Sequence, residues 1–269
     1  MKKNTQIAVA VAAVVVILGG LAAYFLWQPS PPKPAPVQVQ APPPPLPPPP
    51  AKPEVRQVIE APPAPLPALA DSDRFMLDAL AGLVGNKSLM KFFHTERIIR
   101  NIVATIDNLP RRRAPMNVMP VERAPGQFIV AGTEDDPAIS PKNAARYTPY
   151  VRIAAAIDPK KLVELYVRLY PLFQQAYEEL GYPKLYFNDR LIVAIDNLLA
   201  APDIKEPVKL VRPNVFYLFA DPSLEERSIG QRILMRTGSR NEAIIKGKLR
   251  EIKQELLLHM REKKVGSAG

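Results

Sequence analysis

The sequence predicts a mainly α-helical domain with short β-strands, carried on a single transmembrane helix and a proline-rich stalk. Three observations predict this fold class: an uncharged apolar run near the N-terminus, a proline-rich stretch behind it, and a body whose apolar residues recur at three- and four-residue spacing. We divide the chain into an N-terminus (1–6), a transmembrane helix (7–27), a stalk expected to be disordered (28–70) and a body (71–269).

The transmembrane prediction rests on Ile7 to Trp27, a run of 21 residues without a charge. Roughly 20 apolar residues cross a bilayer core as a helix. Lys2 and Lys3 precede the run, and no positive charge follows it until Lys33. The positive-inside tendency therefore predicts a cytoplasmic N-terminus and an exported body. A cleaved signal peptide is the alternative, but such peptides end in small residues, and this run ends in Tyr-Phe-Leu-Trp.

The stalk carries 18 prolines between Pro29 and Pro67. Proline has a fixed φ and no amide N–H, so we expect an extended polyproline II chain that rises about 3.1 Å per residue. A simple spacer is the first interpretation, and a ligand for a proline-binding partner is the alternative. Val55 to Ile59 (VRQVI) interrupts the prolines and is a candidate for docking or strand pairing.

The first half of the body predicts two helices and a strand. We expect the segment 71–93 to open as a helix that ends at Gly85-Asn86, and a second helix over 96–109 with Thr95 as its N-cap. A short strand is expected over 127–131, between two glycines.

The second half predicts a helical hairpin and further helices. Thr148-Pro149 and Asp158-Pro159 each place a capping residue before proline, which predicts helices over 149–156 and 159–180, the second kinked or briefly broken by Pro171. Asn188 or Asp189 is expected to cap a helix that ends at Leu199. The remaining elements are a strand over 214–219 and helices over 223–237 and 239–264.

Two parts of the body resemble each other. Ile102 to Leu109 reads IVATIDNL and Ile192 to Leu198 reads IVAIDNL, with Asp107 and Asp196 89 residues apart. The Pro-Val pairs and the proline-led strands that follow match at offsets of 87 and 88 residues. An internal duplication, with units of about 75–135 and 160–225, is one interpretation. Chance similarity between apolar helices is the other.

Longer motifs resemble a known family. YPLFQQAYEELGYPKLYFNDRLIVAIDNLLAAP from Tyr170, VFYLFADPSLEERSIGQRILMRTG from Val215 and NEAIIKGKLREIKQEL from Asn241 are similar to a membrane-anchored bacterial family catalogued as a domain of unknown function, DUF 3014. The resemblance covers roughly residues 72 to 262. It implies a bacterial inner-membrane protein with its body in the periplasm. It implies no reaction, ligand or functional residue.

Few residues suit catalysis or metal binding. The chain has no cysteine and only two histidines, His94 and His259, which excludes thiol chemistry and disfavours a zinc site. No nucleophile elbow and no phosphate-binding or dinucleotide-binding glycine pattern is present. We therefore expect no metal and no cofactor, and the sequence leans away from an enzyme.

Two groups of charged residues are candidate sites. Asp107 and Asp196 end the two similar helices and are weak candidates for paired catalytic carboxylates acting on envelope glycan. Helix-end hydrogen bonding is the simpler role for both. Six arginines are candidates for contact with an anion or a partner, because guanidinium pairs with planar anions: Arg111, Arg112, Arg113, Arg227, Arg232 and Arg236.

The charge balance favours an anionic partner. The chain carries +10 overall, and residues 71–269 hold 31 Lys or Arg against 24 Asp or Glu. A basic surface attracts anions without selecting among them. With an exported body, nucleic acid is out of reach. We therefore expect a non-enzymatic envelope scaffold or adaptor that presents its basic domain to peptidoglycan or to another envelope protein. The sequence predicts no oligomeric state.

Overall fold

The computed structural model describes residues 55–59, 65–84, 94–113, 124 and 126–264. These residues are mainly helical, which confirms the predicted fold class at that level. The elements in chain order are β1 (Val55–Ile59), a 3-10 helix η1 (Leu69–Asp71), α2 (Ser72–Val84), α3 (Ile98–Asn108), β2 (Val130–Gly132), β3 (Pro137–Ile139), α4 (Lys142–Ala156), α5 (Pro159–Glu179), α6 (Phe187–Leu199), β4 (Leu210–Val211), β5 (Leu218–Phe219), α7 (Pro222–Glu225), α8 (Ile229–Arg236), α9 (Ser239–His259) and β6 (Met260–Lys264).

The predicted transmembrane helix at 7–27 and most of the predicted stalk lie outside the described residues. None of the helices that the structure does describe is both long enough and apolar enough to cross a membrane.

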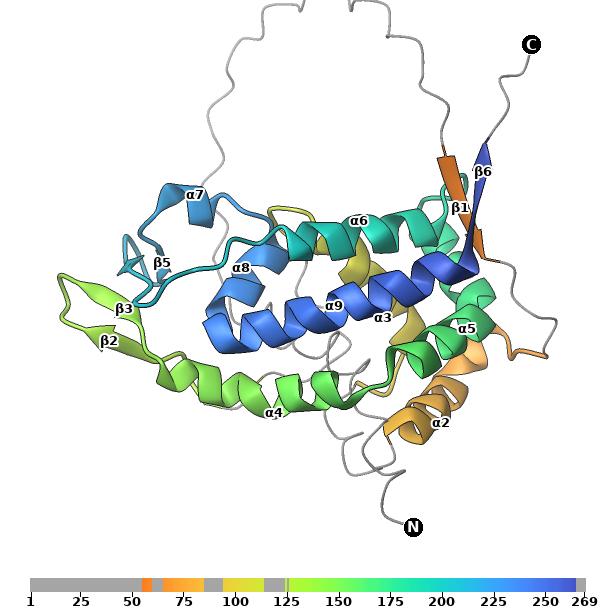
Figure 1. Cartoon of the computed structure of the whole chain (residues 1–269), viewed down its shortest axis with the longest axis horizontal. Helices are drawn as coiled ribbons and strands as arrows, with labels where there is room; N and C mark the ends of the chain where they lie inside the picture. The colour runs from red at the N-terminus through yellow and green to blue at the C-terminus, as the bar shows by residue number, and fades with distance from the viewer. Residues whose placement is uncertain (1–54, 60–64, 85–93, 114–123, 125, 265–269) are drawn as a thin grey trace, which may run out of the picture.

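Helix α9 lies at the centre of the body. It packs against α4, α5 and α6, and α5 packs in turn against α3 and α2. Figure 1 shows α6, α9 and α4 side by side along the long axis of the molecule. A helix in this position must bury more than one face, and α9 does so with an apolar stripe and several buried polar side chains.

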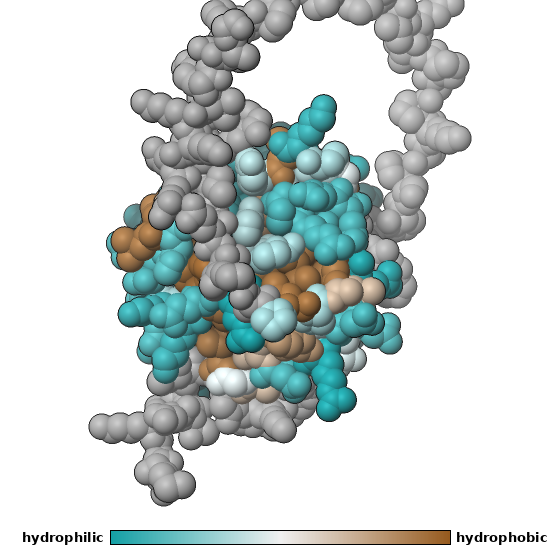
Figure 2. Space-filling view, turned by 90° about the vertical axis from the view of Figure 1, so that its right-hand side faces the viewer, coloured by the Kyte–Doolittle hydropathy of each residue, from teal (hydrophilic) through white to brown (hydrophobic). Residues whose placement is uncertain are grey.

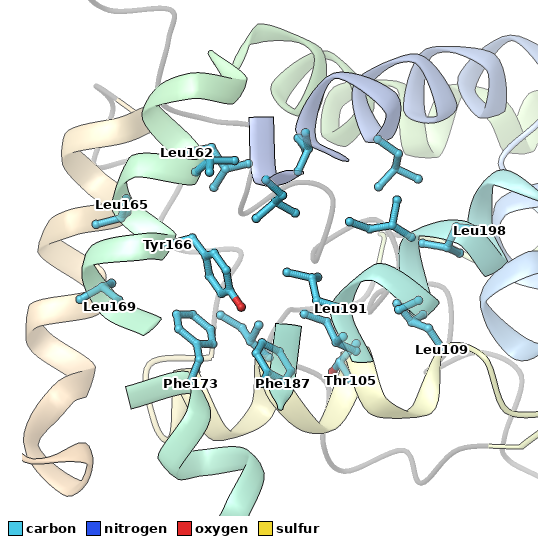
Figure 3. Close-up of a pocket in the computed structure, with 18 of the residues that line it drawn as sticks. Thr105, Leu109, Leu162, Leu165, Tyr166, Leu169, Phe173, Phe187, Leu191 and Leu198 are labelled. Atoms are coloured by element: carbon cyan, nitrogen blue, oxygen red, sulfur yellow. The ribbon is translucent and has the colours of Figure 1, made fainter. Parts of the chain in front are cut away.

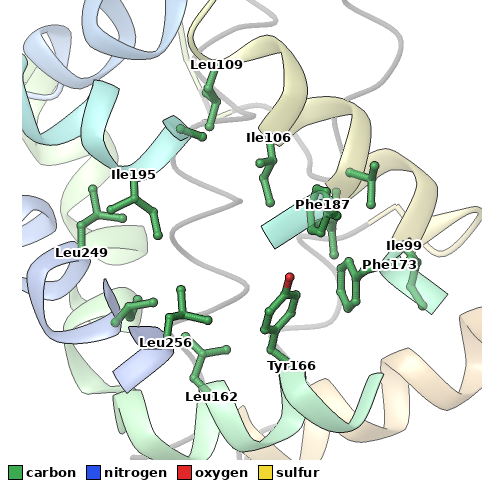
Figure 4. Close-up of a cluster of buried hydrophobic side chains, with 14 of the residues drawn as sticks. Ile99, Ile106, Leu109, Leu162, Tyr166, Phe173, Phe187, Ile195, Leu249 and Leu256 are labelled. Atoms are coloured by element: carbon green, nitrogen blue, oxygen red, sulfur yellow. The ribbon is translucent and has the colours of Figure 1, made fainter. Parts of the chain in front are cut away.

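The core forms where the apolar stripes of α3, α5, α6 and α9 meet. Figure 4 shows Ile106, Leu162, Phe187, Ile195 and Leu256 converging from these four helices. Burial of an aliphatic or aromatic side chain of this size contributes about 1.5–3 kcal/mol. The predicted hairpin of the second half, now α5 and α6, is therefore confirmed as part of the core.

Aromatic rings fix the contact between α5 and α6. The rings of Phe173 and Phe187 stack with their centroids 5.8 Å apart, and the ring of Tyr166 lies 5.3 Å from that of Phe173. The Tyr166 hydroxyl donates to the side-chain oxygen of buried Asn188 at 2.5 Å. Asn188 is thus inside α6 and does not cap it, so that capping prediction was wrong.

The observed N-terminal ends of α5 and α3 confirm one capping prediction and contradict another. Asp158 accepts from the amides of Lys160 and Lys161 at 2.9 and 3.3 Å, which confirms the predicted cap of α5. Thr95 does not cap α3. That helix begins at Ile98, and Asp73 of α2 accepts from the amides of Arg97 and Ile98 at 2.6 and 2.8 Å. The cap comes from another helix, so local sequence could not reveal it.

Two prolines that were predicted to start or interrupt a helix lie inside continuous helices. Helix α4 begins at Lys142, not at the predicted Pro149, which lies within it. Thr148 is not a cap there: its hydroxyl donates to the Ala144 carbonyl at 2.9 Å. The side-chain amide of Asn241 on α9 also donates to Ala144, at 2.9 Å, so packing supports the helix near its proline. Helix α5 likewise continues through Pro171, so the brief break that was one of the two predicted effects does not occur.

The C-terminal elements are shorter than predicted. The strand expected over 214–219 is reduced to β5, and the helix expected over 223–237 is divided into α7 and α8. Ser228 causes this division, because its hydroxyl accepts from the Gln231 amide and starts α8. The helix expected to reach residue 264 ends at His259, where β6 begins.

Three antiparallel strand pairs complete the described structure: β1–β6, β2–β3 and β4–β5. The second and third pairs are linked, because the Ile139 amide donates to the Val208 carbonyl at 2.9 Å. The first pair joins a segment of the predicted stalk to the C-terminal end of α9. Pairing is one of the two roles expected for VRQVI.

Candidate functional site

Asp107 is buried at the C-terminal end of α3, in a cluster with partly exposed side chains. Its side chain is 7% exposed and forms ion pairs with Arg111 Nη2 at 2.7 Å and with Arg190 Nε at 2.9 Å. The Tyr182 hydroxyl lies 3.4 Å from the same carboxylate, and it also accepts from Arg111 at 2.7 Å. Arg190 reaches the cluster from α6 and also donates to the Asp107 carbonyl. The cluster therefore ties α3 to α6 and to the loop after α5.

Asp196 lies in a different environment. Its side chain is 50% exposed, and it forms an ion pair with Lys253 Nζ of α9 at 2.5 Å. Among the described residues, no hydrogen bond or ion pair joins Asp107 to Asp196 or gives them a common partner. The two similar sequence positions thus hold a buried and a solvated acid.

The segment of three arginines is attached to the start of α8. The Ile229 amide donates to the Arg111 carbonyl at 2.7 Å, and Arg232 Nη2 donates to the Arg112 carbonyl at 2.7 Å. The side chain of Arg112 is 70% exposed and lies 3.9 Å from Glu226, a pair too exposed and too long to contribute much. Arg113 is exposed as well. Arg112 and Arg113 therefore remain candidates for contact with an anion.

The three C-terminal arginine candidates differ in exposure. Arg232 is 16% exposed and forms an ion pair with Glu225 at 2.5 Å. Arg236 is 1% exposed, with its guanidinium 4.5 Å above the Phe219 ring and a nitrogen 3.2 Å from the Tyr217 carbonyl. Arg227 is half-buried. Arg232 thus holds α8 to α7 and to the three-arginine segment, and Arg236 holds α8 to β5 and the residues before it. Neither offers its charge to a partner.

The structure reveals exposed cations that the sequence reasoning did not single out. Lys142 and Arg152 of α4, and Lys160 and Lys161 at the start of α5, are exposed, and none forms an ion pair with another described residue. One signal was available: α4 reads KNAARYTPYVRIAAA, with three basic residues and no acidic one. We call these four residues the α4–α5 basic surface.

A buried ion pair on α9 was also missed. Glu242 and Lys246 have side chains 2% and 4% exposed, with 2.8 Å between Glu242 Oε1 and Lys246 Nζ. Lys246 Nζ also donates to the Ala201 carbonyl and to the exposed carboxylate of Asp203, both at 2.6 Å. Burial raises the pKa of Glu242. The sequence contained a signal for this burial, because Glu242 lies one turn before Ile245 on the same apolar face of α9 as Leu249 and Ile252.

A hollow enclosed by the described helices is apolar. It has a volume of about 120 Å³ and lies between α2, α3, α5, α6 and α9. Figure 3 shows its labelled side chains converging on one space from several helices. No group of three or more His, Cys, Asp or Glu that could hold a metal ion occurs in the part of the chain that the structure describes.

A family model with the description "Protein of unknown function (DUF3014)" matches residues 98–253. The chain belongs to this family. The match runs from the first residue of α3 into the last turns of α9, a shorter span than the one expected from sequence motifs. It includes the Asp107 cluster, the α4–α5 basic surface and the Glu242–Lys246 pair, and it leaves out β1, α2 and β6. No curated protein and no solved structure matches the chain.

Proposed function

We propose that this protein is a non-enzymatic scaffold or adaptor of the bacterial cell envelope. A single N-terminal helix would anchor it in the inner membrane with the N-terminus in the cytoplasm. The proline-rich stalk would then carry the body into the periplasm. The body would bind peptidoglycan, the anionic polymer of the wall, through its basic surface, with another envelope protein as the alternative partner.

The α4–α5 basic surface is the observation that carries this proposal. Its four cations are exposed, and no described carboxylate neutralises them by ion pairing. Arg152, Lys160 and Lys161 come from consecutive elements, the end of α4 and the first turn of α5. Exposed cations without ion-pair partners attract polyanions at low ionic strength, and salt screens the attraction.

The alternative of a carboxylate-dependent enzyme on envelope glycan finds no support in the geometry. A general acid or base must reach its substrate, and Asp107 is 7% exposed and held between two guanidinium groups. Its proposed partner, Asp196, forms an ion pair with a separate helix. No other observation favours a reaction, so we propose no catalytic function.

The proposal is tested by sedimentation of the full chain with insoluble peptidoglycan. We expect binding at about 0.05 M salt and loss of most of it at about 0.5 M, because the Debye length falls severalfold over this range. A triple variant with Arg152→Gln, Lys160→Gln and Lys161→Gln should weaken the binding at low salt. The matched control changes Lys184, Lys205 and Arg212 to Gln, which removes the same charge from exposed positions elsewhere.

Each outcome decides one part of the proposal. Equal weakening by both triple variants would assign the binding to net charge and contradict a role for the α4–α5 basic surface. Absence of binding at low salt would remove peptidoglycan as the partner and leave an envelope protein. A reporter fusion that places the body in the cytoplasm would contradict the envelope location itself.

A further inference from the structure

The hollow at the centre of the helices is almost entirely hydrocarbon. Among the side chains that line it, only Thr105 and Tyr166 carry a polar atom. The Tyr166 hydroxyl is already bonded to Asn188 at 2.5 Å, and burial raises its pKa well above the ordinary value, so it stays neutral. A buried water needs about two to four polar partners. This hollow does not supply them, so it favours an apolar occupant over water.

Its size is that of a small binding site. An engineered protein cavity of about 150 Å³, lined by Leu, Ile and Phe, stays dry and binds benzene. The hollow here has a similar lining and a volume of about 120 Å³. It therefore accommodates on the order of six carbon atoms. An empty space of this size forfeits dispersion contacts on every side, so an occupant that restores them binds favourably.

The hollow approaches the surface at two positions. Leu165 of α5 and Leu191 of α6 line it and are only half-buried, whereas most of its other lining residues are buried. Figure 3 labels both among the side chains that surround the hollow. Figure 2 shows apolar side chains gathered in the middle of the face on the β1–β6 side, within a frame of hydrophilic ones. An elongated ligand can enter end-on from such a surface and leave a polar head group in water.

We propose that this hollow binds the terminal segment, about six carbons long, of a single alkyl chain. A chain fits these observations better than a compact ring, because only a chain combines a buried hydrocarbon end with an exit to solvent. The apolar lining specifies a hydrocarbon segment as the ligand and does not specify the head group that the segment carries. None of the four residues of the α4–α5 basic surface lines the hollow.

Two methionines allow a site-specific test in the full chain. Met76 lines the hollow, whereas Met235 is fully buried in a separate cluster with Val208 and Phe219. The full chain, labelled with ¹³C at its methionine methyl groups, is titrated with 1-butanol, 1-pentanol, 1-hexanol and 1-octanol. We expect a saturable shift of the Met76 signal and no shift of Met235. The half-saturating concentration should fall about fourfold per added methylene up to 1-hexanol, then level off.

Variants that fill the hollow separate binding from non-specific effects. Ala194 lines it and is 2% exposed, so Ala194→Leu should abolish the Met76 response. Val163→Leu fills it less and should weaken the response, which provides a second test if the first variant does not fold. Ala145→Leu adds the same atoms at an exposed position of α4 and should leave the titration unchanged. An unchanged Met235 signal confirms that each variant is folded.

Three results would overturn the proposal. An unresponsive Met76 would show that the hollow takes up no hydrocarbon in solution. Shifts shared by Met76 and Met235, linear in alkanol concentration, would indicate a solvent effect. An affinity that rises uniformly through 1-octanol would indicate partition into surrounding lipid or detergent, because a hollow of fixed size must saturate.

Discussion

Asp107 is a buried acidic side chain that forms ion pairs with two arginines. Arg111 follows the C-terminal end of α3, and Arg190 comes from α6. The carboxylate therefore neutralises two cations where α3, α6 and the loop after α5 meet. Breaking a buried ion pair by removal of one partner costs more than the pair itself contributes, because the other charge is left uncompensated. Removal of the Asp107 carboxylate would leave the guanidinium groups of Arg111 and Arg190 without this partner.

We therefore expect Asp107→Asn to lower the free energy of unfolding by about 2–3 kcal/mol, a value below the fully buried range because Arg111 is half exposed. Asp196→Asn is the matched control, since it makes the same change in the similar helix. It removes only an exposed ion pair and should cost less than about 1 kcal/mol. Urea unfolding measures both values. Equal effects would contradict the assignment of Asp107 to a structural role.

At the scale of single elements, α9 combines a central position with buried charges. Glu242 and Lys246 stand one turn apart and face α6 and the loop after it, where Ala201 and Asp203 complete the coordination of the ammonium group. Replacement of a buried ion pair by apolar residues is often neutral, whereas loss of one partner is strongly destabilising. The pair is therefore testable by a double-mutant cycle.

Lys246→Met should destabilise the protein by about 3 kcal/mol, because it leaves the Glu242 carboxylate buried without a cation. The double variant Glu242→Met/Lys246→Met should recover at least about 2 kcal/mol of that loss. Thermal or urea unfolding of the four members of the cycle measures the coupling. A double variant as unstable as Lys246→Met would show that the Ala201 contact, and not the ion pair, provides the stability.

The same pair predicts a pH dependence. Burial raises the pKa of Glu242 above its ordinary value of 4.5. At a pH between the pKa of the unfolded state and that of the folded state, the folded protein therefore binds more protons than the unfolded protein. The contribution of Glu242 to stability therefore falls as the pH rises through this window. Wild type should lose stability relative to Glu242→Gln as the pH increases from about 4.5. Urea midpoints across pH 4–8 measure the difference, and parallel curves would refute the prediction.

The elements also show which features a sequence reveals. The stripes of α3 and α5 and the Asp158-Pro159 start were predictable, because periodicity and capping are local. The cap of α3 by Asp73, the Tyr166–Asn188 bond and the full length of α4 were not, because each depends on a partner in another element. The same reasoning applies to the site. Asp107 was identified by position, but only packing shows that it is buried and Asp196 exposed.

At the scale of the whole molecule, the β1–β6 pair links the two ends of the described chain. Val55 pairs with Lys264 and Ile59 with Met260, so the segment that interrupts the prolines lies beside β6, the strand that follows α9. Both strands lie outside the region that matches the family. In the proposed scaffold, this pair would fix the point at which the stalk leaves the body, and thereby the direction in which the α4–α5 basic surface faces.

The absence of cysteine makes this pairing open to a disulfide test. Gln57 and Glu262 are Cα partners in the ladder, and antiparallel partners lie about 4.5–5.5 Å apart, within the range that a disulfide spans. The full chain with Gln57→Cys and Glu262→Cys should therefore cross-link under mild oxidation, as a shift in non-reducing gel mobility. Gln57→Cys with Lys264→Cys, two residues out of register, should not, because about 6.6 Å along the strand separates the sites. Equal cross-linking of both pairs would indicate proximity without a fixed register, and failure of both would contradict the pairing.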